Sequence, residues 1–124
     1  MITNKTKNKV ISTKKIFAEN FLNKSIGLMF SKKNFTPLIF VFKKEKIIPL
    51  HMLFVFFPID VLFLDKDRKV VELKEKFMPF AFYTPKYKAL YIIELPSGII
   101  KKTKTRVGDN LDFNVKLEKD KNKL

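Results

Sequence analysis

Between Ile47 and Leu64 the chain reads IIPLHMLFVFFPIDVLFL, and the interpretation of the fold starts from this segment. Two prolines divide it, and its longest unbroken apolar run, Met52 to Phe57, is far shorter than the roughly 20 residues of a membrane-spanning helix. A proline has no N–H to donate within a β-sheet, so each one marks a bend or a break. We predict buried strands over residues 47–57 and 59–65, with a bend at Pro49, and no membrane span.

Short runs of β-branched and aromatic residues, separated by turns, lie on both sides of this segment. Residues 87–95 are apolar on both faces, which is typical of a central strand. Apolar and charged residues alternate over 69–76, which is typical of a half-exposed strand, with Glu72 on its outer face. We predict strands at 37–42, 69–76, 87–95 and 111–115, turns at 43–46, 65–68 and 108–109, an irregular loop at 77–86 and a helical turn at 99–104.

The apolar residues between Phe17 and Met29 recur at helical spacing and fill about half of a helical wheel. Gly27 lowers helix stability near the end of this segment. We predict one amphipathic helix over residues 17–29. Short strands with a single real helix favour a mainly β fold (β-rich α+β), built as a compact sandwich or a small barrel.

The chain has 124 residues, the size of one domain, and 46% of them are hydrophobic, which is enough apolar surface for one core. It is also strongly basic, with 26 Lys and Arg against 12 Asp and Glu and a net charge of +14. We predict a single β-rich domain over residues 10–115, with frayed basic tails at 1–9 and 116–124 that lack apolar residues for packing. The basic start is too polar for the apolar centre of a signal peptide, so we expect a cytoplasmic protein.

The composition excludes several kinds of catalytic and metal site. With no cysteine and one histidine, the chain has no thiolate zinc site, cysteine nucleophile or multi-histidine site. Three glycines do not form a phosphate-binding or dinucleotide-binding glycine motif. We therefore predict no catalytic residue, no metal ligand and no cofactor from these motifs.

Two carboxylates lie in apolar surroundings. Asp60 is two residues from Leu62, and Glu94 is two residues from Ile92, so on a strand each acid shares a face with apolar side chains. A carboxylate in such a place is costly unless it is paired or hydrogen-bonded. One interpretation is that the two acids converge near His51 as a general acid and base, or as part of a metal site.

We favour a structural interpretation of both acids. Each would lie at a strand end and accept hydrogen bonds from backbone N–H groups of a neighbouring turn, which would hold Pro58 and Gly98 in place.

His51 is a lone histidine next to a fully apolar run, and we favour a packed, hydrogen-bonded residue over a ligand or proton carrier. Together with Met29 and Met52 it offers donors for a soft metal such as Cu(I). Methionines on apolar segments usually fill gaps in a core, which is the interpretation we favour for both.

The net charge also points to nucleic-acid binding as an alternative. Surface lysines can contact phosphates, and the loop aromatics Phe80, Phe82, Tyr83 and Tyr87 can offer stacking faces. No arginine-rich stripe, recognition helix or RNA-binding aromatic motif accompanies them. We expect salt-sensitive, non-specific adhesion rather than specific recognition.

Four sequence blocks stand in order along the chain. They are IGLMF at 26–30, PLHMLFVFFPIDVLFLD at 49–65 after the run at 38–42, YIIELPSG at 91–98 and VGD at 107–109. Together, over about residues 10 to 115, they resemble the archaeal branch of the family called domain of unknown function 192.

The resemblance implies a compact, mainly β domain with a jelly-roll-like or barrel-like arrangement, and it assigns no reaction. By resemblance, the signature positions are Met29, Met52, Asp60, Glu94 and Gly98. Most of them suit a scaffold, with the glycine at a special backbone angle, the methionines in the core and the acids tying loops.

The leading hypothesis is a small binding or interaction domain without catalysis, with any pocket near His51, Asp60 and Glu94. The first alternative is an enzyme or a metal-binding site that uses these three residues. The second alternative is salt-sensitive nucleic-acid binding through surface lysines and loop aromatics. The partner and the oligomeric state stay open at this point.

Overall fold

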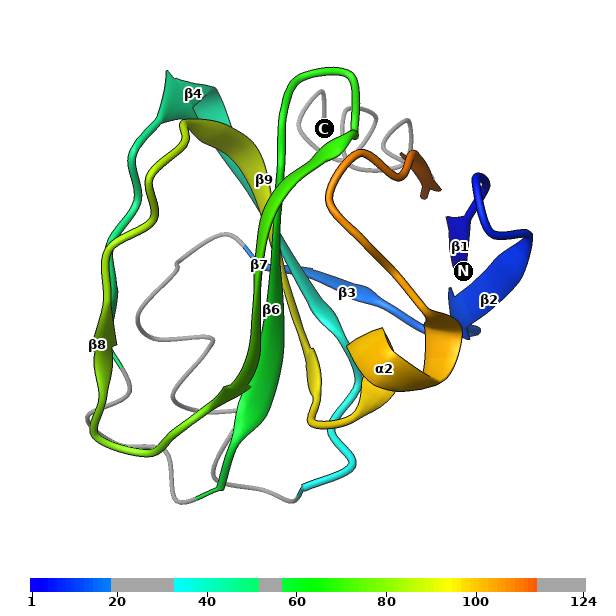
Figure 1. The fold of residues 1–124 in the computed structure, drawn as a ribbon, viewed down its shortest axis with the longest axis horizontal. Helices are drawn as coiled ribbons and strands as arrows, with labels where there is room; N and C mark the ends of the chain where they lie inside the picture. Colours follow the sequence, from blue (N-terminus) through cyan, green and yellow to red (C-terminus); the bar gives the residue numbers. More distant parts are fainter. Residues whose placement is uncertain (19–32, 52–56, 114–124) are drawn as a thin grey trace, which may run out of the picture.

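A five-stranded sheet forms the centre of the computed structural model, which describes residues 1–18, 33–51 and 57–113 (Figure 1). In spatial order its strands are β3 (Ile16–Ala18), β4 (Leu38–Lys46), β9 (Ala89–Pro96), β6 (Ile59–Leu64) and β7 (Val70–Phe77). β3 runs parallel to β4, and the other neighbours are antiparallel.

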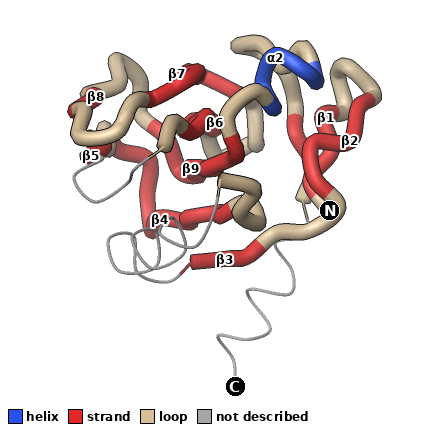
Figure 2. The backbone as a smooth tube through the Cα atoms, turned by 90° about the horizontal axis from the view of Figure 1, so that it is seen from below, coloured by secondary structure: helices blue, strands red, loops and turns tan. Residues whose placement is uncertain are grey.

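Two smaller sheets and a short helix flank the five-stranded sheet. The first small sheet has the order β10 (Leu111–Asp112), β1 (Ile2–Asn4), β2 (Lys9–Ser12). The second pairs β5 (Leu50–His51) with β8 (Phe82–Tyr83), and the helix is α2 (Ile99–Thr103). Figures 1 and 2 show the first small sheet and the helix on one side of the molecule, and the second small sheet on the opposite side.

Each face of the central sheet carries its own apolar cluster. In β6, Leu62 and Leu64 belong to one cluster, whereas Val61 and Phe63 belong to the other. This division follows from strand geometry, since successive side chains point to opposite faces. Residues from β1, α2 and β10 complete the first cluster, and residues from β5 and the nearby Phe57 complete the second. β6 is therefore buried on both sides, which explains why its sequence is almost continuously apolar.

The structure confirms the mainly β fold. The strands predicted at 59–65, 69–76 and 87–95 correspond to β6, β7 and β9, and the helical turn predicted at 99–104 corresponds to α2. β9 lies in the middle of the sheet, as its apolar sequence predicted. Within the described residues α2 is the only helix, and it is too short to cross a membrane.

The predicted turn at 43–46 is wrong, because these residues continue strand β4. Lys46 pairs with Ala89 of β9, four residues beyond the end of the predicted strand. Backbone pairing with β9 therefore prevails over the turn preference of this charged segment.

The predicted helix over residues 17–29 is wrong at its start, because residues 17 and 18 belong to a strand. Ile16–Ala18 form β3, and the N–H of Ile16 donates to the carbonyl oxygen of Pro37 at 2.9 Å. Ile16 packs against one apolar cluster and Phe17 against the other, which is the two-residue period of a strand. Residues 19–29 of the prediction lie outside the described residues.

The prediction of a frayed tail at residues 1–9 is also wrong. Ile2 and Asn4 are both fully buried in β1, the first in an apolar cluster and the second in a polar network. These two side chains, together with the pairing of β1 with β2 and β10, anchor this segment although its composition is mostly polar. The tail predicted at 116–124 lies outside the described residues.

Candidate functional site

Asp60 has no exposed surface, and both of its carboxylate oxygens accept hydrogen bonds from backbone N–H groups. Its Oδ1 accepts from the N–H of Lys76 at 3.0 Å. Its Oδ2 accepts from Gly98 at 3.1 Å and from Ile100 at 2.9 Å. This is the structural arrangement that we favoured, and it stabilises Gly98 in its left-handed conformation, with φ of 97°.

Glu94 is also buried, but it does not converge with Asp60. In the pairing of β6 with β9, Asp60 is opposite Leu95, whereas Glu94 is opposite Val61. Directly opposed residues share a sheet face, and adjacent residues on a strand point to opposite faces. The two carboxylates therefore lie on opposite faces of the sheet, a geometry that does not form an acid–base pair.

The remaining predicted residues contribute less to the geometry of a site. His51 belongs to β5, where its backbone is paired with Phe82, and its side chain lies outside the described part of the chain. Met29 and Met52 also lie outside it. Among the residues that are described, no three His, Cys, Asp or Glu side chains cluster as metal ligands.

Glu72 forms an anchor that the sequence does not predict. Alternation along 69–76 predicts an exposed side chain, yet Glu72 is only 9% exposed. Its Oε2 accepts a hydrogen bond from the Tyr83 hydroxyl, and its Oε1 accepts from the N–H groups of Lys86 at 2.8 Å and Tyr87 at 3.2 Å. Burial, and then the hydrogen bond and charge of Glu72, raise the pKa of Tyr83 to about 12. The loop from β8 to β9 is thus tied down over β7.

A second unpredicted network joins the N-terminal hairpin to the turn before β10. Asp109 accepts hydrogen bonds from Asn4 Nδ2 at 2.9 Å and from the N–H of Arg106 at 2.9 Å, and it pairs with Lys7 Nζ at 2.8 Å. Burial raises the pKa of Asp109, but the bonds from Asn4, Lys7 and Arg106 outweigh it and lower the pKa below its usual value. No residue spacing indicates this network, because Asp109 lies 105 residues from Asn4 and 102 residues from Lys7.

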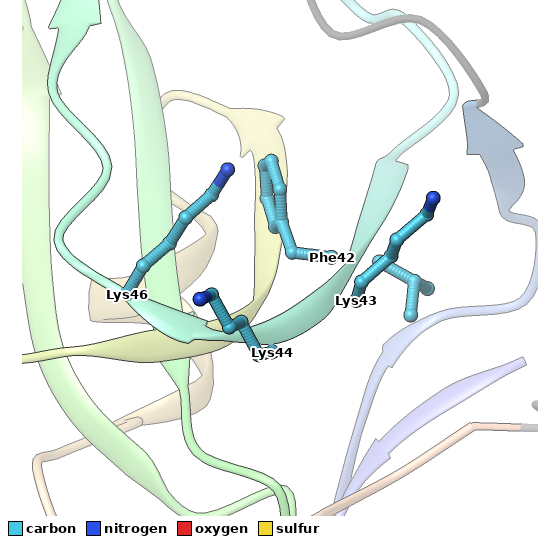
Figure 3. Close-up of a pocket in the computed structure, with 5 residues that line it drawn as sticks. Phe42, Lys43, Lys44 and Lys46 are labelled. Atoms are coloured by element: carbon cyan, nitrogen blue, oxygen red, sulfur yellow. The ribbon is translucent and has the colours of Figure 1, made fainter.

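A hollow in the described surface lies along β4. Its volume is about 540 Å³, within the range of pockets for small ligands, and we call it the β4 groove. Figure 3 shows Lys43 and Lys46 extending on either side of Phe42. The Nζ of Lys46 lies 5.1 Å from the centre of the Phe42 ring. The groove is lined by Val41, Phe42, Lys43, Lys44 and Lys46.

An irregularity in strand pairing gives the β4 groove its shape. Val41 pairs with Tyr91, but the next pair along the two strands is Lys46 with Ala89. β4 thus places more residues between the two pairs than β9 does, and the extra backbone forms a bulge. Lys43 and Lys44 lie within this irregular stretch and Lys46 at its end, and all three line the β4 groove with Phe42.

The carboxylate nearest to the β4 groove in sequence is already used elsewhere. Glu45 Oε2 accepts a hydrogen bond from the N–H of Lys66, in the turn between β6 and β7, at 2.9 Å. Within the described residues the one ion pair is that of Lys7 with Asp109. The lysines of the β4 groove are therefore not neutralised by a described carboxylate, and they form a local positive surface.

Comparison with known sequences gives a consistent set of matches. The family model of domain of unknown function 192, described as "Uncharacterized ACR", matches residues 2–113. A UPF0127 protein of Pyrococcus furiosus is 43% identical over 113 residues, which cover 90% of this chain and 96% of that protein. A UPF0127 protein of Thermococcus sibiricus is 39% identical over 121 residues, which cover 96% of this chain and 78% of that one.

Two solved structures share the fold at low sequence identity. A protein of unknown function from Novosphingobium aromaticivorans matches with a TM-score of 0.69 at 19% identity, over 80% of this chain and 74% of that chain. A chain from Sinorhizobium meliloti, provisionally described as a transcription regulator, also has a TM-score of 0.69, at 22% identity and over 79% of each chain. At these identities the likeness concerns the fold alone.

Proposed function

This chain belongs to the family domain of unknown function 192, and on that premise we propose that it is a small binding domain whose β4 groove holds an anionic ligand. The observation that carries the proposal is the grouping of Lys43, Lys44 and Lys46 around one hollow, with Glu45 bonded to the adjacent turn. Three ammonium groups around a concave surface attract carboxylates, phosphates or sulfates.

A binding role also agrees better than catalysis with the buried acids. The two oxygens of Asp60 accept three backbone hydrogen bonds, so this carboxylate is committed to the scaffold. Glu94 lies on the other face of the sheet, and the two acids therefore do not flank a common substrate position. The positions of Asp60 and Glu94 therefore do not support an enzyme that pairs these two acids.

The β4 groove is tested by calorimetric titration with inorganic tripolyphosphate at an ionic strength of about 0.1 M, where the Debye length is about 10 Å. We compare the wild-type chain with the triple variant K43Q/K44Q/K46Q. Each exposed charge contact contributes about 0.5 kcal/mol, so loss of three should weaken binding about tenfold. Added salt should reduce the wild-type affinity as well, because exposed charges are screened.

The matched control is the triple variant K5Q/K9Q/K14Q, which removes the same charge from the N-terminal region. We expect the affinity of this control to stay within about twofold of wild type, because charges farther from the β4 groove than the Debye length contribute little to binding there. Equal weakening by both triple variants would show a general charge effect and would contradict a site at β4.

A second candidate function is binding of single-stranded nucleic acid, which is favoured by exposed rings on the loop after β7. Phe82 is 66% exposed and Tyr87 is 59% exposed, and the exposed Lys86 lies in the same loop. Tyr83, which we also named as a stacking residue, is instead packed against Phe63 and Phe77. Base stacking on such rings contributes about 1–3 kcal/mol for each base.

This candidate is tested by fluorescence anisotropy with a labelled single-stranded oligonucleotide. The variant F82S/Y87S should bind at least about fivefold more weakly, which corresponds to the loss of about 1 kcal/mol of stacking. The variant V10S, at an exposed position on β2, serves as the control. Unchanged affinity of F82S/Y87S would leave the β4 groove as the better explanation of any binding.

A further inference from the structure

A second basic hollow lies at the other end of β6. Its volume is about 360 Å³, and it is lined by Glu75, Lys76, Lys101 and Arg106. The N–H of Lys76 is bonded to Asp60, at the start of β6. Glu45, which lies between two lysines of the β4 groove, is instead bonded to the N–H of Lys66, just after the end of β6. The two hollows are therefore separated by the length of a central strand.

The three cations of this hollow come from three different segments. Lys76 belongs to β7, Lys101 to α2, and Arg106 to the turn that follows α2. Their grouping is a product of the tertiary structure, and it differs in this respect from the lysines of β4, which are neighbours in sequence.

Two buried carboxylates hold the backbone beneath all three cations. Asp60 accepts hydrogen bonds from the N–H of Lys76 and from the N–H of Ile100, the residue before Lys101. Asp109 accepts a hydrogen bond from the N–H of Arg106 at 2.9 Å. Both carboxylates are at least 96% buried, so these are rigid attachments rather than surface contacts.

The backbone at Lys76 is in an unfavourable conformation. Its φ of 49° is left-handed, a region that a lysine rarely occupies without compensation. The hydrogen bond from its N–H to Asp60 holds it there. Strained positions that the surroundings maintain are concentrated at ligand clamps and active sites.

The charge of the hollow is unbalanced. Its lining contains three cationic side chains and one carboxylate, Glu75. In the described part of the chain, no carboxylate other than Asp109 lies within 4.0 Å of a cationic group, so Glu75 does not pair with Lys76, Lys101 or Arg106. A compact anion would therefore find cationic side chains that no described carboxylate pairs with.

We propose that this hollow binds a compact tetrahedral oxyanion, a phosphoryl or sulfuryl group, carried by a small molecule or free in solution. The Arg106 guanidinium offers paired N–H donors that match two oxygens of such a group. Lys76 and Lys101 supply point charges from the other walls. Asp60 and Asp109 keep the backbones that carry these side chains in place.

The test is a titration of the whole chain with inorganic phosphate, followed through backbone amide signals in two-dimensional NMR. The amides of Lys76, Lys101 and Arg106 should shift together along one binding curve. R106Q should weaken binding about tenfold, because it removes paired charge-assisted hydrogen bonds, and K101Q about threefold, because it removes one exposed charge contact. R106K should recover only part of the loss, because lysine keeps the charge but lacks the paired donors.

K102Q is the matched control, because Lys102 lies next to Lys101 on α2, is exposed, and does not line the hollow. Its affinity should stay within about twofold of wild type. Weakening by K102Q equal to that by K101Q, or the absence of joint shifts at the three amides, would overturn the proposal.

Two further arms separate this site from the β4 groove and identify the source of the oxyanion. The variant K43Q/K44Q/K46Q should leave the shifts at Lys76, Lys101 and Arg106 unchanged, so that either site can fail without the other. Titration with glycerol phosphate then compares an ester with the free ion. Tighter binding of the ester indicates a phosphorylated small molecule, equal binding indicates the free oxyanion, and binding of neither overturns the proposal.

Discussion

At the scale of single residues, the buried carboxylates show how far alternation along a strand can be trusted. Asp60 lies on the same strand face as apolar residues and is indeed buried, because both faces of β6 are covered by other parts of the chain. Glu72 lies on the opposite face from its apolar neighbours, where an exposed side chain is expected, yet it is buried under the loop that carries Tyr83. Alternation identifies the two faces of a strand, but the rest of the chain determines whether a face is covered.

Replacement of Asp60 by Asn tests its role as a backbone anchor. The amide has one acceptor oxygen where the carboxylate has two, so at least one of the three N–H groups loses its partner. We expect the free energy of unfolding to fall by about 2–4 kcal/mol, measured by urea denaturation. The control D112N, at an exposed position in β10, should change it by less than about 0.5 kcal/mol. A similar small change in D60N would contradict the anchor.

The raised pKa of Tyr83 predicts a late step in the absorbance titration of tyrosine. Its pKa in the folded chain is about 12, whereas an unfolded tyrosine titrates near about pH 10. The contribution of the neutral Tyr83 hydroxyl to the free energy of unfolding is therefore complete below about pH 10 and is lost as the pH rises towards about 12. The variant Y83F should lack the step near pH 12, and Y87F should keep it. A step that persists in Y83F would assign it to another tyrosine.

At the scale of elements, the N-terminal hairpin shows how a polar segment acquires a fixed position. β1 pairs with β2 on one side and with β10, near the other end of the described chain, on the other. The network of Asn4, Lys7 and Asp109 then joins the hairpin to the turn before β10. β1 has one buried apolar side chain and one buried amide. It is held in place by its pairing with β2 and β10 and by the hydrogen bond to Asp109.

The same network predicts a particular dependence of stability on pH. Asp109 has a lowered pKa in the folded chain, so its stabilisation is present at pH values above the unfolded pKa of about 4. It is lost as the pH falls through that value and through the folded pKa. In urea denaturation at several pH values, D109N should be less stable than wild type at neutral pH and should lose less stability on acidification. Parallel acid profiles for the two chains would contradict this assignment.

At the scale of the whole molecule, one sheet is shared by two apolar cores. β6 and β9 contribute alternate side chains to both clusters, so neither core can lose its packing without disturbing the strands that support the other. The charged side chains lie mainly outside these cores, and the structure groups part of them into two basic hollows at opposite ends of β6.

Neighbouring residues of β6 allow the coupling of the two cores to be tested. Leu62→Ala empties space in one cluster and Phe63→Ala in the other, and each should cost about 3–5 kcal/mol of unfolding free energy. Thermal unfolding followed by circular dichroism in the far and near ultraviolet should show one coincident transition for each variant. The control Val10→Ala, at an exposed position, should have a small effect. Two separate transitions in either variant would mean that the cores unfold independently.

The mainly β fold, the central place of β9 and the buried position of Asp60 could all be predicted from the amino-acid sequence. These follow from the period of apolar residues and from prolines and glycines, which act through neighbours along the chain. The prediction of helix at Phe17 was wrong, because Ile16 and Phe17 pack on opposite faces of a strand that forms by pairing with β4.

The tertiary structure alone decided which charged groups meet. Lys76, Lys101 and Arg106 line one hollow although they lie in three segments, and Asp60 and Glu94 are separated although both alternate with apolar residues. The physical reason is that strand register and chain connections, set by the packing of both cores, determine the distances between residues remote in sequence. Local periodicity carries no information about those distances.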